Sequence, residues 1–181
     1  AAFFNLNSHD PDKYPAFPTH DDDGGVPVGL TSFIELCNRT MFAAAKDMGR
    51  YAFNGVLLEI DPSEITLVAT DGRRLSVAHA DCETGVSERR SAIVPIKGLQ
   101  QLQRAAGKDA ETVRIDVLDT MIAFKLPRTE IQGLLVEGEF PDFRAVLPGD
   151  QDAPERVALD REAFSSAINR ASITAGASAR G

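Results

Sequence analysis

The sequence predicts an α+β fold in which two helices pack against antiparallel β-sheets. Apolar residues recur at helical spacing in two segments, and eight other segments are short, apolar and rich in β-branched residues. The order along the chain is strand, helix, several strands, helix, several strands. This order favours antiparallel sheets with the helices on one side over a doubly wound fold, in which strands and helices alternate one by one.

The first strand and helix are expected in the segment 26–45. Residues 26–30, VPVGL, have the composition of a strand. Thr31 is a suitable N-cap for a helix over residues 32–45, because its hydroxyl can accept a hydrogen bond from an amide of the first turn. The apolar residues of this helix lie near helical spacing, at Phe33, Leu36, Cys37 and Met41.

The next part of the chain predicts three successive strands. The segments 55–60 and 64–70 are apolar and rich in β-branched residues, and Asp61-Pro62-Ser63 between them has the composition of a turn. They therefore form a predicted hairpin. Residues 73–80 continue as a third strand, after a turn at Asp71-Gly72.

The second half follows a similar order. Residues 91–96 predict a strand, and residues 97–106 predict a helix with Leu99 and Leu102 on one side. Two further turns, Asp119-Thr120 and Pro127-Arg128, separate a final series of strands, expected at residues 112–118, 121–126 and 130–136.

Length and composition indicate a soluble globular protein. The chain has 181 residues, 43% of them hydrophobic and 25% charged, which suits one ordinary domain with parts of its neighbours. No apolar run approaches the roughly 20 residues of a membrane helix, and the N-terminus lacks the features of a secretion signal. We therefore expect a cytoplasmic protein with no membrane association.

Charge and cysteine content restrict the possible functions further. The net charge of −8 argues against a surface that binds nucleic acid everywhere, so any such binding must be local. Cys37 and Cys82 have no metal-ligand spacing, and we expect both to be plain thiols. The sequence indicates neither a metal site nor a cofactor.

An internal repeat indicates an array of similar modules. KYPAFP near the start matches EFPDFR near the end, with Pro15 against Pro141, and LCNRTMFAA matches AINRASITA, with Asn38-Arg39 against Asn169-Arg170. The acidic, Pro-rich and Gly-rich stretch before Gly25 is typical of a linker. We therefore predict the end of a first module with the linker at residues 1–25, a complete middle module at 26–150, and the truncated start of a third at 151–181.

Templates for catalysis fit poorly. Asp21, Asp23 and Gly24 have the relative spacing of a calcium loop, but Thr19 and Leu30 occupy positions where that loop requires acids. Asp71 is a possible general base, yet no second acid or nucleophile stands beside it in the sequence, and a turn role suits it better. A small metal-dependent hydrolase using Asp21, Asp23 and Asp71 is the alternative hypothesis from another functional class.

Basic residues gather on or beside the two predicted helices. Long basic side chains on a polar helix face can contact phosphates without reading bases. A solvated helix face explains the same pattern equally well, because surface Lys and Arg are common. The residues concerned are Arg39, Lys46, Arg50, Lys97, Arg104 and Lys108.

Four ordered motifs carry a resemblance to a known family. RYAFNGVLLEI, LVATDGRRLSVAHA, IVPIKGLQQLQR and EGEFPDFRAVLP resemble successive segments of the middle domain of the bacterial β sliding clamp, the processivity subunit of DNA polymerase III. The resemblance covers nearly the whole chain. It implies a non-catalytic protein, a ring of two subunits with three similarly folded domains each, whose helices line a central hole around duplex DNA.

The resemblance also implies two sets of site residues. The DNA-facing residues are expected to be Arg39, Lys46, Arg50, Tyr51, Lys97 and Arg104, with contacts independent of DNA sequence. Half of a hydrophobic pocket is expected to bind peptide segments of the DNA polymerase III core, the clamp loader and repair polymerases. Its residues are Phe53, Thr70, Gly72, Arg73, Arg74, Leu75, Pro141 and Val146.

Two positions depart from the family pattern and affect these sites. Ala145 stands where the family often has a basic residue, and Ala52 stands where a second aromatic residue can follow Tyr51. The rest of the pocket and the ring-closing surfaces would belong to other domains. The 181-residue chain alone is therefore expected to be a monomer.

Overall fold

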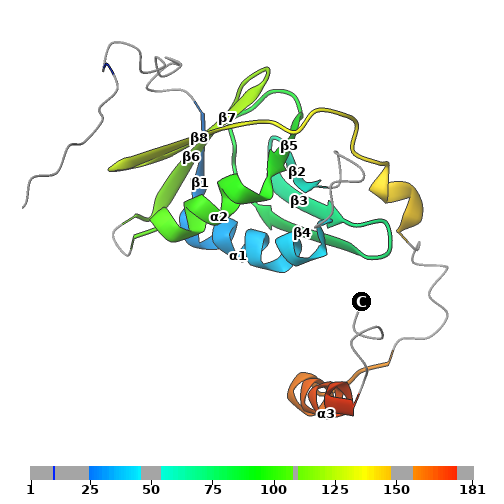
Figure 1. Cartoon of the computed structure of the whole chain (residues 1–181). Coiled ribbons are helices and arrows are strands. Elements are labelled where there is room, and N and C mark those ends of the chain that lie inside the picture. Colours follow the sequence, from blue (N-terminus) through cyan, green and yellow to red (C-terminus); the bar gives the residue numbers. More distant parts are fainter. Residues whose placement is uncertain (1–9, 11–24, 46–53, 108–109, 148–156, 175–181) are drawn as a thin grey trace, which may run out of the picture. The chain divides into compact units, whose positions relative to one another are not determined.

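The computed structural model describes residue 10 and residues 25–45, 54–107, 110–147 and 157–174. The chain divides into two compact units, Ala1–Pro141 and Asp142–Gly181, and each is described by itself. The described part of the first unit holds two four-stranded antiparallel sheets and two α-helices (Figure 1). None of the described helices has the length and apolar character needed to cross a membrane. The predicted α+β class is confirmed.

The first sheet contains the predicted hairpin. Its strands are β2 (Gly55–Ile60), β3 (Glu64–Thr70), β4 (Leu75–Asp81) and β5 (Arg90–Pro95), in the order β4-β3-β2-β5. All four lie within two residues of the predicted segments. The turn between β2 and β3 is closed by the Asp61 amide, which donates to the Glu64 carbonyl at 2.9 Å.

The second sheet collects the remaining strands. They are β1 (Val26–Gly29), β6 (Thr112–Val117), β7 (Met121–Leu126) and β8 (Thr129–Leu134), in the order β1-β6-β7-β8. The three strands predicted at the end of this region form a continuous antiparallel series, in which Arg114 lies opposite Lys125 and Lys125 lies opposite Glu130. The predicted strand at residues 26–30 is confirmed, although it pairs with β6, far away in the sequence.

The two sheets are linked by an exchange of strands. The chain runs through strand, helix and three strands twice, first as β1, α1 (Leu30–Thr40) and β2 to β4, then as β5, α2 (Ile96–Ala105) and β6 to β8. β1 pairs with β6 of the second half, and β5 pairs with β2 of the first half. Neither half therefore completes a four-stranded sheet from its own strands.

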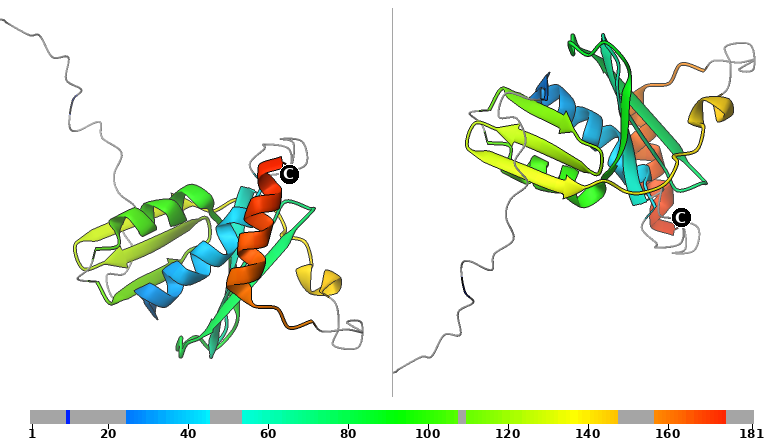
Figure 2. Two further views of the ribbon diagram at one scale, coloured as in Figure 1. Left: turned by 90° about the horizontal axis from the view of Figure 1, so that it is seen from below. Right: turned by 90° about the horizontal axis from the view of Figure 1, so that it is seen from above.

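The two helices lie side by side (Figures 1 and 2). The Gln103 side-chain amide on α2 donates to the Asn38 side-chain oxygen on α1 at 2.9 Å. α1 contacts β3 and β4 of one sheet and β1 and β6 of the other, whereas α2 contacts β5 and β8. Each helix thus bridges the two sheets.

The main apolar core fills the space between the helices and the sheets. The rings of Phe33 on α1 and Phe124 on β7 lie 6.1 Å apart, and both side chains are almost fully buried. Such a core supplies most of the driving force for folding, because it removes apolar surface from water. The helical residues buried against it are Leu30, Phe33, Leu36, Cys37 and Thr40 on α1 and Gly98, Leu99 and Leu102 on α2.

The predicted ends of the first helix are wrong. α1 begins at Leu30 with Gly29 as its N-cap, and Thr31 is an exposed residue inside the helix. The Leu30 amide donates to the Glu111 carbonyl at 2.9 Å, so the entry to the helix is fixed by pairing beside β6. α1 also ends early, because the Thr40 hydroxyl donates to the Leu36 carbonyl and a short 3₁₀ turn, η2 (Met41–Ala43), follows.

The second unit contains a 3₁₀ turn, η4 (Phe143–Val146), and a helix, α3 (Arg161–Thr174). The Asp160 carboxylate accepts a hydrogen bond from the Ala163 amide at 2.7 Å, which is the usual geometry of an N-terminal cap. The segment that repeats residues of α1, around Asn169-Arg170, lies within α3. Both copies of the repeated segment are therefore helical.

Candidate functional site

The turn between β3 and β4 is held by a buried hydroxyl. Thr70, at the end of β3, accepts a hydrogen bond from the Gly72 amide at 3.0 Å and donates to the Arg74 carbonyl at 2.7 Å. Gly72 has φ of +85°, a backbone conformation that glycine adopts without steric cost. The position of this turn is therefore set by its own side chains and backbone.

Asp71 adds three hydrogen bonds to the same turn. Its Oδ1 accepts from the backbone amides of Arg73 and Arg74, both at 3.0 Å, and its Oδ2 accepts from Nε of Arg74 at 3.0 Å. These contacts lower the pKa of the Asp71 carboxyl, because they stabilise its charged form. The hydrogen bond from the Arg73 amide contributes most, followed by the Arg74 amide and side chain. The prediction that Asp71 is a turn residue is confirmed.

An apolar layer lies next to this turn, on the face of the first sheet that points away from the helices. Cross-strand partners place Val77, Val68, Leu57 and Ile93 in one row across β4, β3, β2 and β5. Leu57, Val68 and Ile93 are buried although none belongs to the main core. Val77, on the edge strand, is 36% exposed. The row forms a floor that is open at β4.

Thr70 and Leu75 lie on the same face as this row. They are cross-strand partners, and each is two residues from a member of the row, so the alternation of side chains along a strand puts them on one side. Leu75 is half-buried, whereas Gly72, Arg73 and Arg74 are exposed. The structure thus brings five of the predicted pocket residues together in one turn beside an apolar floor.

The residues of this floor were not singled out from the sequence. A signal was present, because the runs Val56–Leu58 and Leu67–Ala69 are continuously apolar and do not alternate with polar residues. Continuous apolar runs are typical of strands that are buried on both faces. They predict a second layer, although they do not identify its role.

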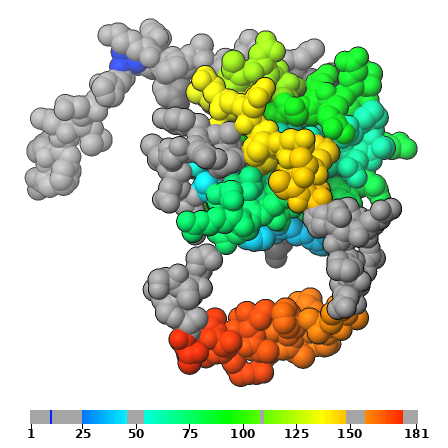
Figure 3. All heavy atoms as spheres, turned by 90° about the vertical axis from the view of Figure 1, so that its right-hand side faces the viewer, coloured from blue at the N-terminus to red at the C-terminus, as the bar shows by residue number. Residues whose placement is uncertain are grey.

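The segment after β8 runs along the other edge of the same sheet. The Val136 amide donates to the Ile93 carbonyl of β5 at 2.9 Å. A Cβ atom built on Gly55 would lie 2.5 Å from Cγ2 of Ile93 and 3.2 Å from Cγ2 of Val136, so this segment packs closely on β2 and β5. Figure 3 shows part of the segment, in yellow, at the surface.

Three further residues were predicted to line this pocket. Phe53 lies outside the described residues. Pro141 is exposed at the end of the first unit, and Val146 is 70% exposed in the second unit. A complete pocket that includes these residues stays a prediction.

The helices carry an exposed basic face. Arg39 on α1 and Lys97 and Arg104 on α2 are all exposed, and the described residues of the two helices include one acid, Glu35, which pairs with Arg39. The hydrogen bond between Gln103 and Asn38 shows that the two helices that carry these cations are neighbours. The other predicted DNA-facing residues, Lys46, Arg50 and Tyr51, lie outside the described residues.

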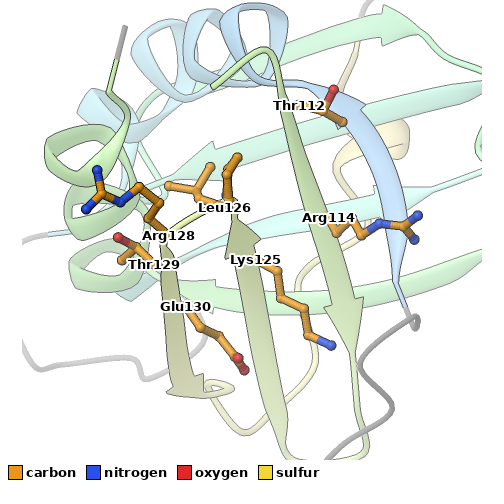
Figure 4. Close-up of a pocket in the computed structure, with 8 residues that line it drawn as sticks. Thr112, Arg114, Lys125, Leu126, Arg128, Thr129 and Glu130 are labelled. Carbon is orange, nitrogen blue, oxygen red and sulfur yellow. The ribbon is translucent and has the colours of Figure 1, made fainter. Parts of the chain in front are cut away.

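A separate hollow of about 570 Å³ lies over the second sheet (Figure 4). The hollow is distinct from the turn at Thr70, which belongs to the first sheet. Its positive charge is partly balanced, because Glu130 lies opposite Lys125 in the strand register. The lining residues are Thr112, Arg114, Lys125, Leu126, Pro127, Arg128, Thr129 and Glu130.

Neither cysteine is joined in a disulfide, as predicted. Burial raises the pKa of the Cys37 thiol to about 12, and partial burial together with the Glu83 charge raises the pKa of Cys82. Among the residues that the structure describes, no three His, Cys, Asp or Glu side chains are grouped so that they could hold a metal ion. Asp21 and Asp23 lie outside that part of the chain.

Comparisons with known proteins agree on one family. Residues 28–142 match the model of the DNA polymerase III beta subunit, central domain. The chain is 28% identical to the beta sliding clamp of Bacillus subtilis over 174 residues, covering 96% of this chain and 46% of that protein. It is 30% identical to the beta sliding clamp of Staphylococcus aureus over 172 residues, covering 95% of this chain and 45% of that protein.

Solved structures give the same result for the fold. The DNA polymerase sliding clamp of Bacillus subtilis matches with a TM-score of 0.85 and 26% identity, covering 96% of this chain and 45% of that one. The DNA polymerase III subunit beta of Pseudomonas aeruginosa matches with a TM-score of 0.80 and 28% identity, covering 92% and 46%. The chain therefore spans about half the length of the relatives it matches.

The matched family domain coincides with the part of the chain that forms the two sheets. It begins in β1 and ends at Asp142, directly after the first compact unit. The chain belongs to the family of the DNA polymerase III beta subunit, and residues 28–142 form its central domain.

Proposed function

We propose that this chain is part of a sliding clamp, a non-catalytic processivity factor of the bacterial replicative DNA polymerase. The full-length protein would be a ring-shaped homodimer that encircles duplex DNA and docks the polymerase, the clamp loader and repair polymerases. The observation that carries the proposal is the match of residues 28–142, which include both sheets and both helices of the first unit, to the central domain of the beta subunit. The alternative of a metal-dependent hydrolase has no support, and the carboxylate of Asp71 is engaged in its turn.

The exposed basic face of α1 and α2 is the proposed DNA-facing surface. Arg39, Lys97 and Arg104 can contact phosphates without reading bases, which lets a ring move along the duplex. An acidic protein with a local basic face suits this task, because the net charge of −8 limits tight binding elsewhere on the surface. The proposed set also includes Lys46, Arg50 and Tyr51.

Charge reversal on α2 tests the DNA-facing surface. In the full-length protein, Lys97→Glu with Arg104→Glu should shorten the residence time of the ring on closed circular DNA. The slope of log binding constant against log salt concentration should fall by the amount expected for about two lost phosphate contacts. The matched control reverses two exposed arginines outside the helices, Arg90→Glu with Arg128→Glu, which should leave residence unchanged. Equal effects of the two pairs would contradict the proposed orientation.

Without a closed ring, the 181-residue chain should be monomeric and should bind DNA poorly. A few exposed phosphate contacts are weak at physiological salt, so only the topology of the ring would keep the protein on DNA. Sub-micromolar affinity of this chain for linear duplex at about 150 mM salt would contradict that mechanism. Analytical ultracentrifugation would report its oligomeric state in the same buffer.

The turn at Thr70 and the apolar floor beside it are the proposed docking site for partner peptides. Leu75, Val77 and the row behind them offer apolar contacts, and the arginines of the turn offer a polar rim. Phe53, Pro141 and Val146 are proposed to complete this half of the pocket. An apolar, glutamine-containing clamp-binding peptide is the expected ligand.

An NMR titration tests the docking site. The peptide should shift the signals of residues 70–77 selectively, and Leu75→Asp should abolish the response because it puts a charge into the apolar contact. A similar solved structure, the sliding clamp of Pseudomonas aeruginosa, is bound to griselimycin, so this compound is a second probe. Shifts confined to the second sheet with both probes would overturn the assignment.

The repeat supports the proposed division into modules at residues 1–25, 26–150 and 151–181. The buried α1 residues Phe33, Leu36, Cys37 and Thr40 align, at the spacing of the Asn-Arg repeat, with Phe164, Ala167, Ile168 and Ala171 on α3. The α3 positions are all apolar and exposed within the described residues. They have the pattern of a first helix that packs on sheets of its own module.

A further inference from the structure

We propose that Asp71 is a positioning residue for peptide docking, because it fixes the guanidinium of Arg74 in a binding orientation before the peptide arrives. This inference rests on the proposed docking function of the turn. It assigns different roles to the neighbouring residues Arg73 and Arg74, which cannot be distinguished from the sequence. It also gives a binding role to a carboxylate that itself contacts no ligand.

The geometry of Asp71 supports this role. One carboxylate oxygen accepts from the two backbone amides of Arg73 and Arg74, and the other accepts from Nε of Arg74, all at 3.0 Å. The two backbone contacts use the first oxygen alone, as in an ordinary Asx-turn. The second oxygen restrains the arginine side chain itself.

The restrained arginine keeps donors for a ligand. A guanidinium has five N–H groups, and the contact with Asp71 uses the one on Nε. Both terminal nitrogens of Arg74 remain, on a side chain that is 48% exposed. An acceptor oxygen of a docked peptide, from its backbone or a side chain, can therefore bind the terminal nitrogens without breaking the contact to Asp71.

The backbone of the turn adds to this restraint. The Arg74 carbonyl accepts from the Thr70 hydroxyl at 2.7 Å, and its amide donates to Asp71. Leu75, the next residue, is already paired with Thr70 in the sheet. Arg74 is thus held at its amide, its carbonyl and its Nε, whereas Arg73 is held at its amide by Asp71.

Preorganisation of this kind changes affinity in a predictable way. Ordering a long side chain on binding costs about 0.5–1.5 kcal/mol, which corresponds to about two- to tenfold in the dissociation constant. Because Asp71 orders Arg74 in the free protein, that cost is not incurred when the peptide binds. Loss of the carboxylate should raise the dissociation constant of the peptide by the same factor.

Asp71→Asn is the decisive variant. Asparagine keeps an oxygen that can accept from the two backbone amides, but it loses the charged contact with Nε of Arg74. We expect the turn to persist, with backbone NMR signals of residues 70–75 close to those of the parent, and the Arg74 Nε–H to exchange faster with water. The clamp-binding peptide should bind about two- to tenfold more weakly in an NMR titration of the 181-residue chain.

A double-mutant cycle separates positioning from general charge effects. Asp71→Asn should weaken peptide binding in the Arg73→Gln background as in the parent, and should have no further effect in the Arg74→Gln background. Asp119→Asn, which removes one exposed carboxylate from the turn between β6 and β7, should leave peptide affinity unchanged. Additive losses in the Arg74→Gln background would overturn the inference.

Leu75→Asp distinguishes this inference from the proposed function. If Leu75→Asp abolishes peptide binding while Asp71→Asn binds like the parent, the docking site stands and the positioning role of Asp71 is wrong. If Leu75→Asp leaves binding unchanged, the peptide does not use this turn and both proposals are wrong.

Discussion

Substitution of Gly55 by alanine should destabilise the first unit more than its small size suggests. A Cβ atom at this position would lie 2.5 Å from Cγ2 of Ile93, 2.9 Å from the Val94 carbonyl oxygen and 3.2 Å from Cγ2 of Val136. The two methyl groups can move, but the carbonyl belongs to β5, which is paired with β2 along its whole length. The strands themselves must therefore separate or slide.

The expected cost follows from overpacking of a well-ordered interior. Insertion of a methyl group into such a site costs about 1–3 kcal/mol, and we expect Gly55→Ala to cost about 2 kcal/mol, the middle of that range. For a unit of this size, about 2 kcal/mol corresponds to a fall in Tm of about 6–10 °C. This is a large share of the about 5–15 kcal/mol by which a domain is stable.

Two other glycines provide matched controls for thermal and chemical denaturation. Gly107→Ala meets no atom within 4 Å and has no unusual backbone angle, so it should be neutral or slightly stabilising. Gly85→Ala also meets no atom, but its φ of +72° predicts a loss of about 1 kcal/mol from backbone strain alone. In a double-mutant cycle, Ile93→Ala should cost less in the Gly55→Ala background than in the parent, because it removes the shortest contact of the new methyl group. A Gly55→Ala protein as stable as Gly107→Ala would refute the reasoning.

Three further predictions concern the core, the thiols and the turn. Phe33→Ala should lower the free energy of unfolding by about 3–5 kcal/mol in urea denaturation, because it opens a cavity beside Phe124. At pH 8 an alkylating reagent should label Cys82 in the folded protein and Cys37 only after unfolding, because Cys37 is buried and its pKa is about 12. Mass spectrometry would measure the two labelling rates, and equal rates in the folded protein would contradict the burial of Cys37. Folding lowers the pKa of Asp71, so the contribution of this carboxyl to stability is fully present above its unfolded pKa of about 3.9 and is lost as the pH falls through the folded pKa. An NMR titration of the carboxyl with a midpoint at or above about 3.9 would contradict this.

The strands were predictable to within about two residues because their signals are local. The hairpin of β2 and β3 has two apolar segments around Asp61-Pro62-Ser63, and the structure pairs them directly. The start of α1 was not predictable in the same way. The first amide of the helix, that of Leu30, donates to the carbonyl of Glu111, which is distant in the sequence. Thr31 therefore does not cap the helix, although threonine is a suitable capping residue.

The candidate site was predicted in part. The turn at Asp71-Gly72 follows from local composition, and its hydrogen bonds stay within five residues. The apolar floor beside it depends on strand register, which places Val77, Val68, Leu57 and Ile93 in one row. Composition cannot supply that register, so the sequence identified the rim of the site and not its floor.

The strand exchange between the two halves has a consequence for how the protein reaches its native state. Val26 of β1 pairs with Ile115 of β6, so β1 has no partner in its sheet until 89 further residues have been made. At about 5–20 residues per second, this delay lasts about 4–18 seconds. Contacts between distant parts of a chain also slow folding, because the entropy of closing a long loop is lost before the contact forms. Newly made chains would therefore expose an unpaired β1 during synthesis, and the central domain would fold only when both halves are present.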